Sequence, residues 1–172
     1  MNDLIAFYNG DVVHPDGYTL DEILAKDDYW LEEKHNYIQW LFPLNKPSEA
    51  VPGSPIISQQ EVEQFRVDAN LKSKLILSFQ RMLKFYGFTL AFDPDHHPML
   101  VKGPNFEKRK PEWQTPQNHN FKRITRILES MTLLGLPDVA ATFFSSLTEV
   151  YQGDSSTIGK TTYHYWEQAV GA

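Results

Sequence analysis

The sequence contains no cysteine among its 172 residues. Disulfide bonds, thiolate metal sites and cysteine nucleophiles are therefore excluded, and a reducing compartment suits the chain. No apolar run approaches the roughly 20 residues that a membrane-spanning helix needs. The first residues, MNDLIAFYNGD, carry no basic region ahead of the apolar positions, so they do not resemble a signal peptide. We therefore expect a soluble, cytoplasmic protein without a membrane span.

Positive charge and familiar catalytic motifs are scarce as well. The 16 Lys and Arg residues stand against 22 Asp and Glu, which gives a net charge of -6 and disfavours nucleic-acid binding through bulk charge. No glycine-rich loop precedes a helix, and neither G-x-S-x-G nor H-E-x-x-H occurs. We expect no cofactor and favour a binding protein over an enzyme, although an unfamiliar catalytic site stays open.

Core-forming side chains, by contrast, are abundant. Hydrophobic residues make up 41% of the chain, which includes 11 Phe, 8 Tyr and 4 Trp. This composition is too apolar for a disordered chain, and the length suits one domain with a sizeable core. We expect residues 1–172 to form a single helical domain.

Proline marks the connections between helices. Four of the 11 prolines fall between Pro43 and Pro55 and five between Pro94 and Pro116, whereas the segments between carry helical periodicity. Two capping boxes, T-L-D-E at residues 19–22 and S-Q-Q-E at 58–61, mark helix starts. The pattern predicts helices over residues 20–26, 28–42, about 59–86, about 118–134, from 137 and near the C-terminus.

The predicted architecture is an all-α bundle of five or six helices around the long helix 59–86. A long irregular insertion lies between residues 88 and 117, in which FTLAF and PMLVK could pair as a small hairpin. Trp40 stands at the apolar end of the predicted 28–42 helix, so we expect its side chain in the core.

The fragment E-x-x-H, formed by Glu32 and His35, has the helical spacing by which a carboxylate and an imidazole share a metal. A di-iron bundle needs this motif twice together with two further glutamates, and no second copy occurs. We therefore predict no metal site, with Glu32 and His35 as the weak candidates. His35 instead falls in an apolar stripe, where we expect a buried, hydrogen-bonded histidine.

The remaining clustered histidines lie in turn-like sequences. HPDG contains His14, and DPDHHP contains His96 and His97. Such loops can bind metal adventitiously, but PDG and DPD are also ordinary turn chemistry. We interpret them as turns.

A basic stripe, formed by His119, Lys122, Arg123 and Arg126, has the spacing of one helix edge. In an acidic protein these groups either pair internally, for instance with Glu32 or Glu33, or face an anionic ligand or acidic partner. Arg123 lies nearer the apolar face, so we expect it to be more buried than Arg126.

Two segments, HNYIQWLFPL and HNFKRITRIL, carry a family resemblance, together with PDGYTLDEILAKDDYWLEEK ahead of the first. Over roughly Asn9 to Gly135 the chain resembles the conserved N-terminal region of the opioid growth factor receptor family, in a stand-alone form without the vertebrate C-terminal extensions. The resemblance implies a receptor of an enkephalin peptide, unrelated in fold to the seven-helix opioid receptors, and a nuclear or perinuclear location for vertebrate members. The matched positions are His35, Tyr37, Gln39, Trp40, Phe42, Pro43, His119, Asn120, Arg123 and Arg126.

The preferred interpretation is a helical domain that binds an unknown peptide, protein or small anionic ligand. We expect the two motif segments to meet. One alternative is an enzyme or metal protein centred on Glu32, His35 and His119, and another is the enkephalin receptor activity that the family name implies. The candidate ligand or partner contacts are Gln39, Trp40, His119, Asn120, Arg123 and Arg126.

Overall fold

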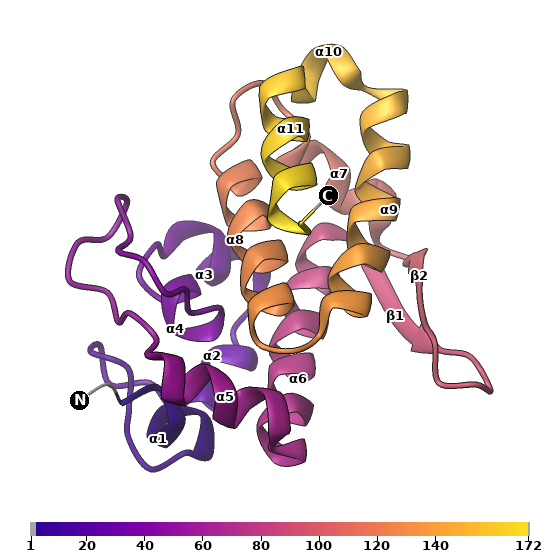
Figure 1. Ribbon diagram of the computed structural model, residues 1–172. Coiled ribbons are helices and arrows are strands. Elements are labelled where there is room, and N and C mark those ends of the chain that lie inside the picture. The colour runs from indigo at the N-terminus through magenta and orange to yellow at the C-terminus, as the bar shows by residue number, and fades with distance from the viewer. Residues whose placement is uncertain (1–2, 172) are drawn as a thin grey trace. The chain divides into compact units, whose positions relative to one another are not determined.

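The computed structural model describes residues 3–171 and divides the chain into two compact units, which meet in sequence between Ser78 and Phe79. The described residues form eleven helices and one two-stranded sheet (Figure 1). The predicted all-α class is confirmed. The helix number is higher than the predicted five or six, because two predicted helices are broken and several short ones carry too few residues for a periodic pattern.

The first unit is built from short helices around an apolar core. Tyr8 lies in this core, where its hydroxyl donates to the Leu41 carbonyl and lies 3.1 Å from Ser78 Oγ. Its helices are α1 (Leu4–Asn9), α2 (Leu20–Leu24), α3 (Asp28–Glu33), α4 (Ile38–Leu41), α5 (Gln59–Val67) and the first part of α6 (Ala69–Tyr86).

The predicted helix over residues 28–42 is wrong as a continuous element. Helix α3 ends at Glu33, and Lys34 is extended, with φ −88° and ψ 142°. The Tyr37 hydroxyl donates to the Leu31 carbonyl at 2.7 Å, which satisfies one carbonyl of the last turn. A buried tyrosine thus supports the end of α3, and the chain restarts as the single turn α4.

The predicted long central helix is also broken. Asp68 is extended, with φ −87° and ψ 111°, and its carboxylate accepts from the Leu71 N–H at 3.0 Å. Asp68 therefore ends α5 and caps α6, which is the usual way in which aspartate competes with helix continuation. Both predicted capping boxes, at Thr19 and Ser58, are confirmed.

The second unit packs helices around the end of α6. Helices α8, α9 and α11 contact one another (Figure 1). Trp166 Nε1 donates to the Phe121 carbonyl at 3.1 Å, which fixes α11 on α8. Its elements after α6 are β1 (Phe88–Phe92), β2 (Pro98–Lys102), α7 (Phe106–Trp113), α8 (Asn120–Leu133), α9 (Pro137–Gly153), α10 (Ser155–Ile158) and α11 (Lys160–Ala169).

The predicted hairpin between FTLAF and PMLVK is confirmed. Strands β1 and β2 are antiparallel, with Leu90 opposite Leu100. Helix α7 lies inside the segment that we expected to be irregular, and it contains Pro111. Contacts with α6 hold it, because Arg109 Nε donates to the Phe85 carbonyl at 2.7 Å and Trp113 Nε1 to the Tyr86 carbonyl at 3.0 Å. Those contacts are tertiary, so the local pattern did not predict the helix.

Candidate functional site

Two candidate contacts, Gln39 and Trp40, lie on α4 in the first unit. Gln39 is buried, and its Nε2 donates to the His35 carbonyl at 3.0 Å. Trp40 is half-buried, contrary to our expectation of a core position, because α4 is only one turn long. Its ring packs edge-on against Phe7 and His14, with centroids 5.3 and 5.9 Å away. Trp40 therefore keeps a reachable surface, whereas Gln39 is enclosed.

The buried histidine of this unit is His14, so the prediction of a buried His35 is wrong. His35 follows the end of α3 and is exposed; Glu32 and His35 consequently do not share a helix. His14 is 1% exposed, with Nε2 2.6 Å from the Asn36 carbonyl and Nδ1 accepting from the Asp16 N–H at 3.1 Å. This pattern assigns the proton to Nε2.

Two other candidates, Asn120 and Arg123, belong to a buried polar network in the second unit. Asn120 is fully buried, and its Oδ1 accepts from the Tyr86 hydroxyl at 3.2 Å and from Arg123 Nη1 at 3.4 Å. Its Nδ2 donates to Asn118 Oδ1 at 3.0 Å. A buried amide that is bonded on both sides holds neighbouring elements in register, here α6 and α8. These contacts account for both side chains structurally.

The residues of the basic stripe on α8 differ in burial, as predicted. Arg123 is 6% exposed and Arg126 is half-buried, which confirms the expected order, whereas His119 and Lys122 are exposed. Burial lowers the pKa of Arg126 to about 10, against the opposing effect of Glu129. The pairing of Arg123 with Glu32 or Glu33 and the meeting of the two motif segments stay predictions.

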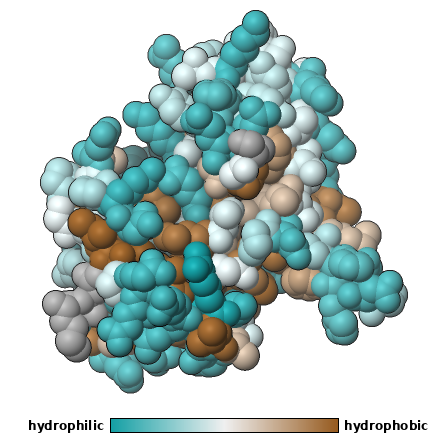
Figure 2. Space-filling model, in the orientation of Figure 1, coloured by the Kyte–Doolittle hydropathy of each residue, from teal (hydrophilic) through white to brown (hydrophobic). Residues whose placement is uncertain are grey.

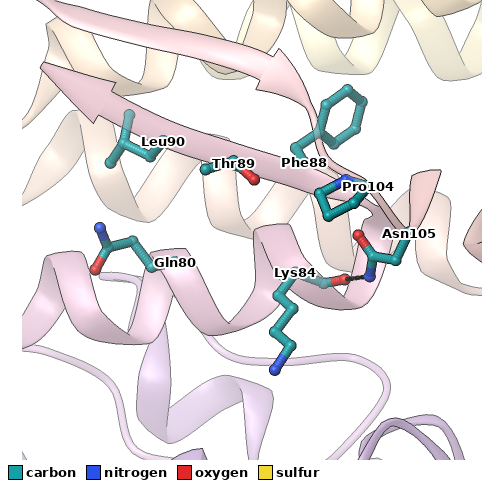
Figure 3. Close-up of a pocket in the computed structure, with 7 residues that line it drawn as sticks. All are labelled: Gln80, Lys84, Phe88, Thr89, Leu90, Pro104 and Asn105. Atoms are coloured by element: carbon teal, nitrogen blue, oxygen red, sulfur yellow. Dashed lines mark hydrogen bonds between the residues drawn. The ribbon is translucent and has the colours of Figure 1, made fainter.

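A pocket of about 380 Å³ lies between α6 and β1 in the second unit, and sequence reasoning missed it. In Figure 3 the α6 residues form one side and the β1 residues the other, while the Lys84 side chain extends away from the strand. Asn105 Nδ2 donates to the Lys84 carbonyl at 2.9 Å across one end. We call it the α6–β1 groove; its lining residues are Gln80, Lys84, Phe88, Thr89, Leu90, Pro104 and Asn105.

The groove follows an unpaired edge of strand β1. Gly103 N–H donates to the Gly87 carbonyl at 2.8 Å and Asp93 N–H to the His97 carbonyl at 2.9 Å, so these two pairs are hydrogen-bonded. Because such pairs alternate along an antiparallel ladder, Thr89 and Ala91 also face β2 with their peptide groups. The peptide groups of Phe88, Leu90 and Phe92 therefore point to the other edge, on which the described residues supply no third strand.

The hairpin turn holds a group of potential metal ligands, Asp93, Asp95 and His97, whose donor atoms lie within 4.8 Å of one another. Asp93 Oδ1 already accepts from the backbone N–H groups of Asp95 and His97, at 2.9 and 2.8 Å. This is the turn chemistry that the sequence predicts. Figure 2 shows hydrophilic atoms at the hairpin tip and hydrophobic ones along the strands behind it.

These features define a mostly helical domain that presents an open hairpin edge and an exposed basic helix face. The family model described as the opioid growth factor receptor (OGFr) conserved region matches residues 1–171. The chain therefore belongs to the opioid growth factor receptor family, and the predicted resemblance is confirmed. Within residues 3–171, none of the helices has both the length and the apolar composition needed to cross a membrane.

Vertebrate relatives match most of this chain but only part of their own length. The mouse opioid growth factor receptor is 36% identical over 136 residues, which cover 77% of this chain and 21% of the mouse protein. The human receptor is 36% identical over 77% of this chain and 20% of its own. Opioid growth factor receptor-like protein 1 of Xenopus tropicalis is 36% identical over 78% of this chain and 26% of its own. No solved structure matches.

Proposed function

We propose that this chain is a binding domain that holds a segment of a partner protein in the α6–β1 groove. The observation that supports this function is the pocket of about 380 Å³ beside an unpaired strand edge. Its volume falls within the roughly 300–1,000 Å³ of typical ligand pockets. The mouse and human relatives of this chain are named receptors, which agrees with a binding role.

The chemistry of the groove suits a peptide better than a small anion. Phe88, Leu90 and Pro104 supply apolar surface, while Gln80 and Thr89 add uncharged polar groups. Lys84 is the one charged residue of the lining, and its side chain extends away from the strand (Figure 3). A segment with apolar side chains and a hydrogen-bonding backbone would satisfy such a surface.

Selection from a phage library of random peptides of about ten residues tests the proposal, with purified protein as bait. We expect enriched peptides whose binding is lost in Gln80→Trp, because the indole fills the groove. The matched control is Ser73→Trp, an exposed position on the same helix outside the groove, which should bind as the parent does. Circular dichroism checks that both variants fold. Equal binding by all three proteins, or no enrichment, would reject the groove as the binding site.

A second candidate site is the exposed part of the basic stripe, for an acidic partner or small anion. His119 and Lys122 are exposed and Arg126 is half-buried, so these groups are reachable. In this site we retain His119 and Arg126 as candidate contacts, with Asn120 and Arg123 as buried support on the same helix. Trp40 stays a separate candidate contact in the first unit, beside the buried Gln39. NMR titration with inorganic phosphate tests this site: saturable shifts in α8 that vanish in Lys122→Ala support it. Shifts that are no larger than those at exposed His164 reject it.

The relatives' names imply a further candidate, an opioid peptide as ligand. Calorimetric titration of the purified chain with an enkephalin tests it directly. Saturable heat would support binding of opioid peptides by this chain. A titration without heat of binding would reject opioid peptides as its ligands.

A metal protein or enzyme centred on Glu32, His35 and His119 is the remaining alternative. Elemental analysis of purified protein is its test, because a stoichiometric transition metal would favour it over the binding domain. For location, we propose the cytoplasm, with the nucleus as the alternative that the family resemblance implies. Imaging of a fluorescent fusion distinguishes the two.

A further inference from the structure

We propose that the partner segment binds as a third strand, antiparallel to β1, with an acidic group at its C-terminal end. This inference rests on the proposed function and specifies how the α6–β1 groove is used. In this inference the peptide groups of Phe88, Leu90 and Phe92 bind the partner segment. None of these residues belongs to a motif that the sequence analysis singled out.

The groove runs along the edge of β1 rather than across a face of the sheet. Phe88, Thr89 and Leu90 all line it, although their side chains alternate between the two faces. No residue of β2 contributes to the lining. The lining therefore takes in β1 and α6 but not β2, so an occupant lies on the side of β1 that carries the unpaired peptide groups. An extended chain is the ligand that matches donors and acceptors repeated at every second residue.

The position of helix α6 favours a partner segment, and not a second copy of this chain, as the occupant of the groove. The helix forms the other wall of the groove through Gln80 and Lys84 (Figure 3). A strand needs about 4.8 Å of lateral spacing. A second copy that offered its own β1 edge would bring its own α6 against this one, because each edge has the same helix beside it. The groove therefore admits a single strand without a helix at its flank.

The two ends of β1 differ in charge, which determines the charges that an antiparallel segment should carry at its own two ends. At the start, the exposed Lys102 lies opposite Phe88. The N-terminus of α7 follows directly after Asn105, whose side chain makes no capping bond there. At the other end, Asp93 and Asp95 form the turn. An antiparallel segment places its C-terminal end at the basic end, so it should carry an acidic group there and a basic one toward the turn.

The side chains of the lining set the composition of the middle of the segment. Leu90, Phe88 and Pro104 offer apolar contact, while the Gln80 amide and Thr89 hydroxyl offer hydrogen bonds. We therefore expect β-branched or other apolar residues that alternate with small polar ones, flanked by charges of the stated sign.

Backbone N-methylation of a selected library peptide is the decisive experiment. Two versions of the peptide are made, one methylated at its odd positions and one at its even positions in the central part. Because only alternate N–H groups of a strand face its neighbour, one version should bind at least about tenfold more weakly and the other should bind nearly as the parent. Equal loss or equal retention in both versions would overturn strand addition. If Gln80→Trp still abolished binding, the groove would remain the site and only this inference would fail.

Hydrogen exchange measured by NMR gives an independent readout on the protein. We expect the amide protons of Leu90 and Phe92 to gain protection when the peptide binds, whereas those of Thr89 and Ala91, which already face β2, stay unchanged. Leu90→Pro removes one open-edge donor without removing a ladder bond, and Leu90→Ala is its matched control. Leu90→Pro should bind more weakly than Leu90→Ala. Protection of Leu90 in a dimer without peptide would overturn the proposal in favour of a second copy.

Discussion

Histidines show at the residue scale how the path of the chain decides burial. His35 falls on an apolar stripe only if residues 28–42 are one helix, and the extended Lys34 removes that condition. His14 stands in the turn-like sequence HPDG, yet its ring is enclosed and hydrogen-bonded at both nitrogens. A turn residue thus becomes a core residue because the chain at Asn36 returns to it.

We predict that His14→Ala destabilises the protein by about 1–3 kcal/mol, since the Asn36 carbonyl and the Asp16 N–H lose their partner. His35→Ala, at an exposed position, should change stability by less than about 0.5 kcal/mol. Urea denaturation of both variants measures the difference. A larger loss of stability for His35→Ala than for His14→Ala would show that His35 has a structural role.

The basic stripe carries a second prediction at this scale. Arg123 is buried beside Asn120, so Arg123→Ala removes a hydrogen bond from a charged donor, worth about 1.5–3 kcal/mol. Arg126 is partly desolvated, which lowers its pKa to about 10, so its removal also relieves a cost of burial. Arg123→Ala should therefore lose clearly more stability than Arg126→Ala in matched denaturation curves. Equal losses would contradict this division.

At the scale of elements, a glycine and an aspartate determine where one helix or strand ends and the next begins. Asp68 ends α5 and starts α6, and Gly87 turns the chain from α6 into β1 with φ +98°. Gly87 also lies against α7, because a Cβ at this position would stand 2.6 Å from Phe106 Cα. The joint therefore needs glycine for its conformation and for the close approach of another backbone.

Substitution of this glycine should separate the two requirements. Gly87→Ala adds the steric contact, about 1–3 kcal/mol, to the cost of the left-handed conformation, about 1–2 kcal/mol. Gly53→Ala is the control, since Gly53 also has positive φ but no atom within 4 Å of the added Cβ. Chemical denaturation should show the larger loss for Gly87→Ala. Similar losses would mean that Phe106 moves aside at little cost.

At the scale of the whole molecule, helix α6 belongs to both compact units. It runs from Ala69 to Tyr86, and the unit boundary falls between Ser78 and Phe79 inside it. A helix interrupted at its middle loses hydrogen bonds on both sides of the break. Unfolding of either unit therefore disturbs the helix of the other.

We predict a single cooperative thermal transition, in accord with the single domain that we expect from the sequence. Calorimetry tests it through the ratio of calorimetric to van't Hoff enthalpy, which is close to one for a two-state domain. The comparison variant is Leu77→Gly, which weakens α6 at an exposed position. If α6 couples the two units, this variant should show separate unfolding transitions for them. Two resolved transitions in the parent protein would contradict the prediction.

Much of the fold follows from the sequence, because the signals are local. The capping boxes at Thr19 and Ser58, the left-handed Gly87 and Gly135 and the N1 position of Pro137 each act within one turn of helix. The hairpin follows from two short apolar runs on either side of a turn. Such features depend on dihedral preferences and nearby hydrogen bonds, so a single sequence suffices to predict them.

Tertiary structure alone decided the rest. Burial of Tyr37 accompanies the end of α3, contacts with Phe85 and Tyr86 hold α7 despite Pro111, and the position of α6 beside β1 creates the groove. Of the candidate contacts, Trp40 and His119 keep exposed surface, whereas Arg123 is buried and Asn120 is buried and bonded to the distant Tyr86. Periodicity tells which side chains share a face, but the enclosure of that face depends on how distant segments pack, which local preferences do not encode.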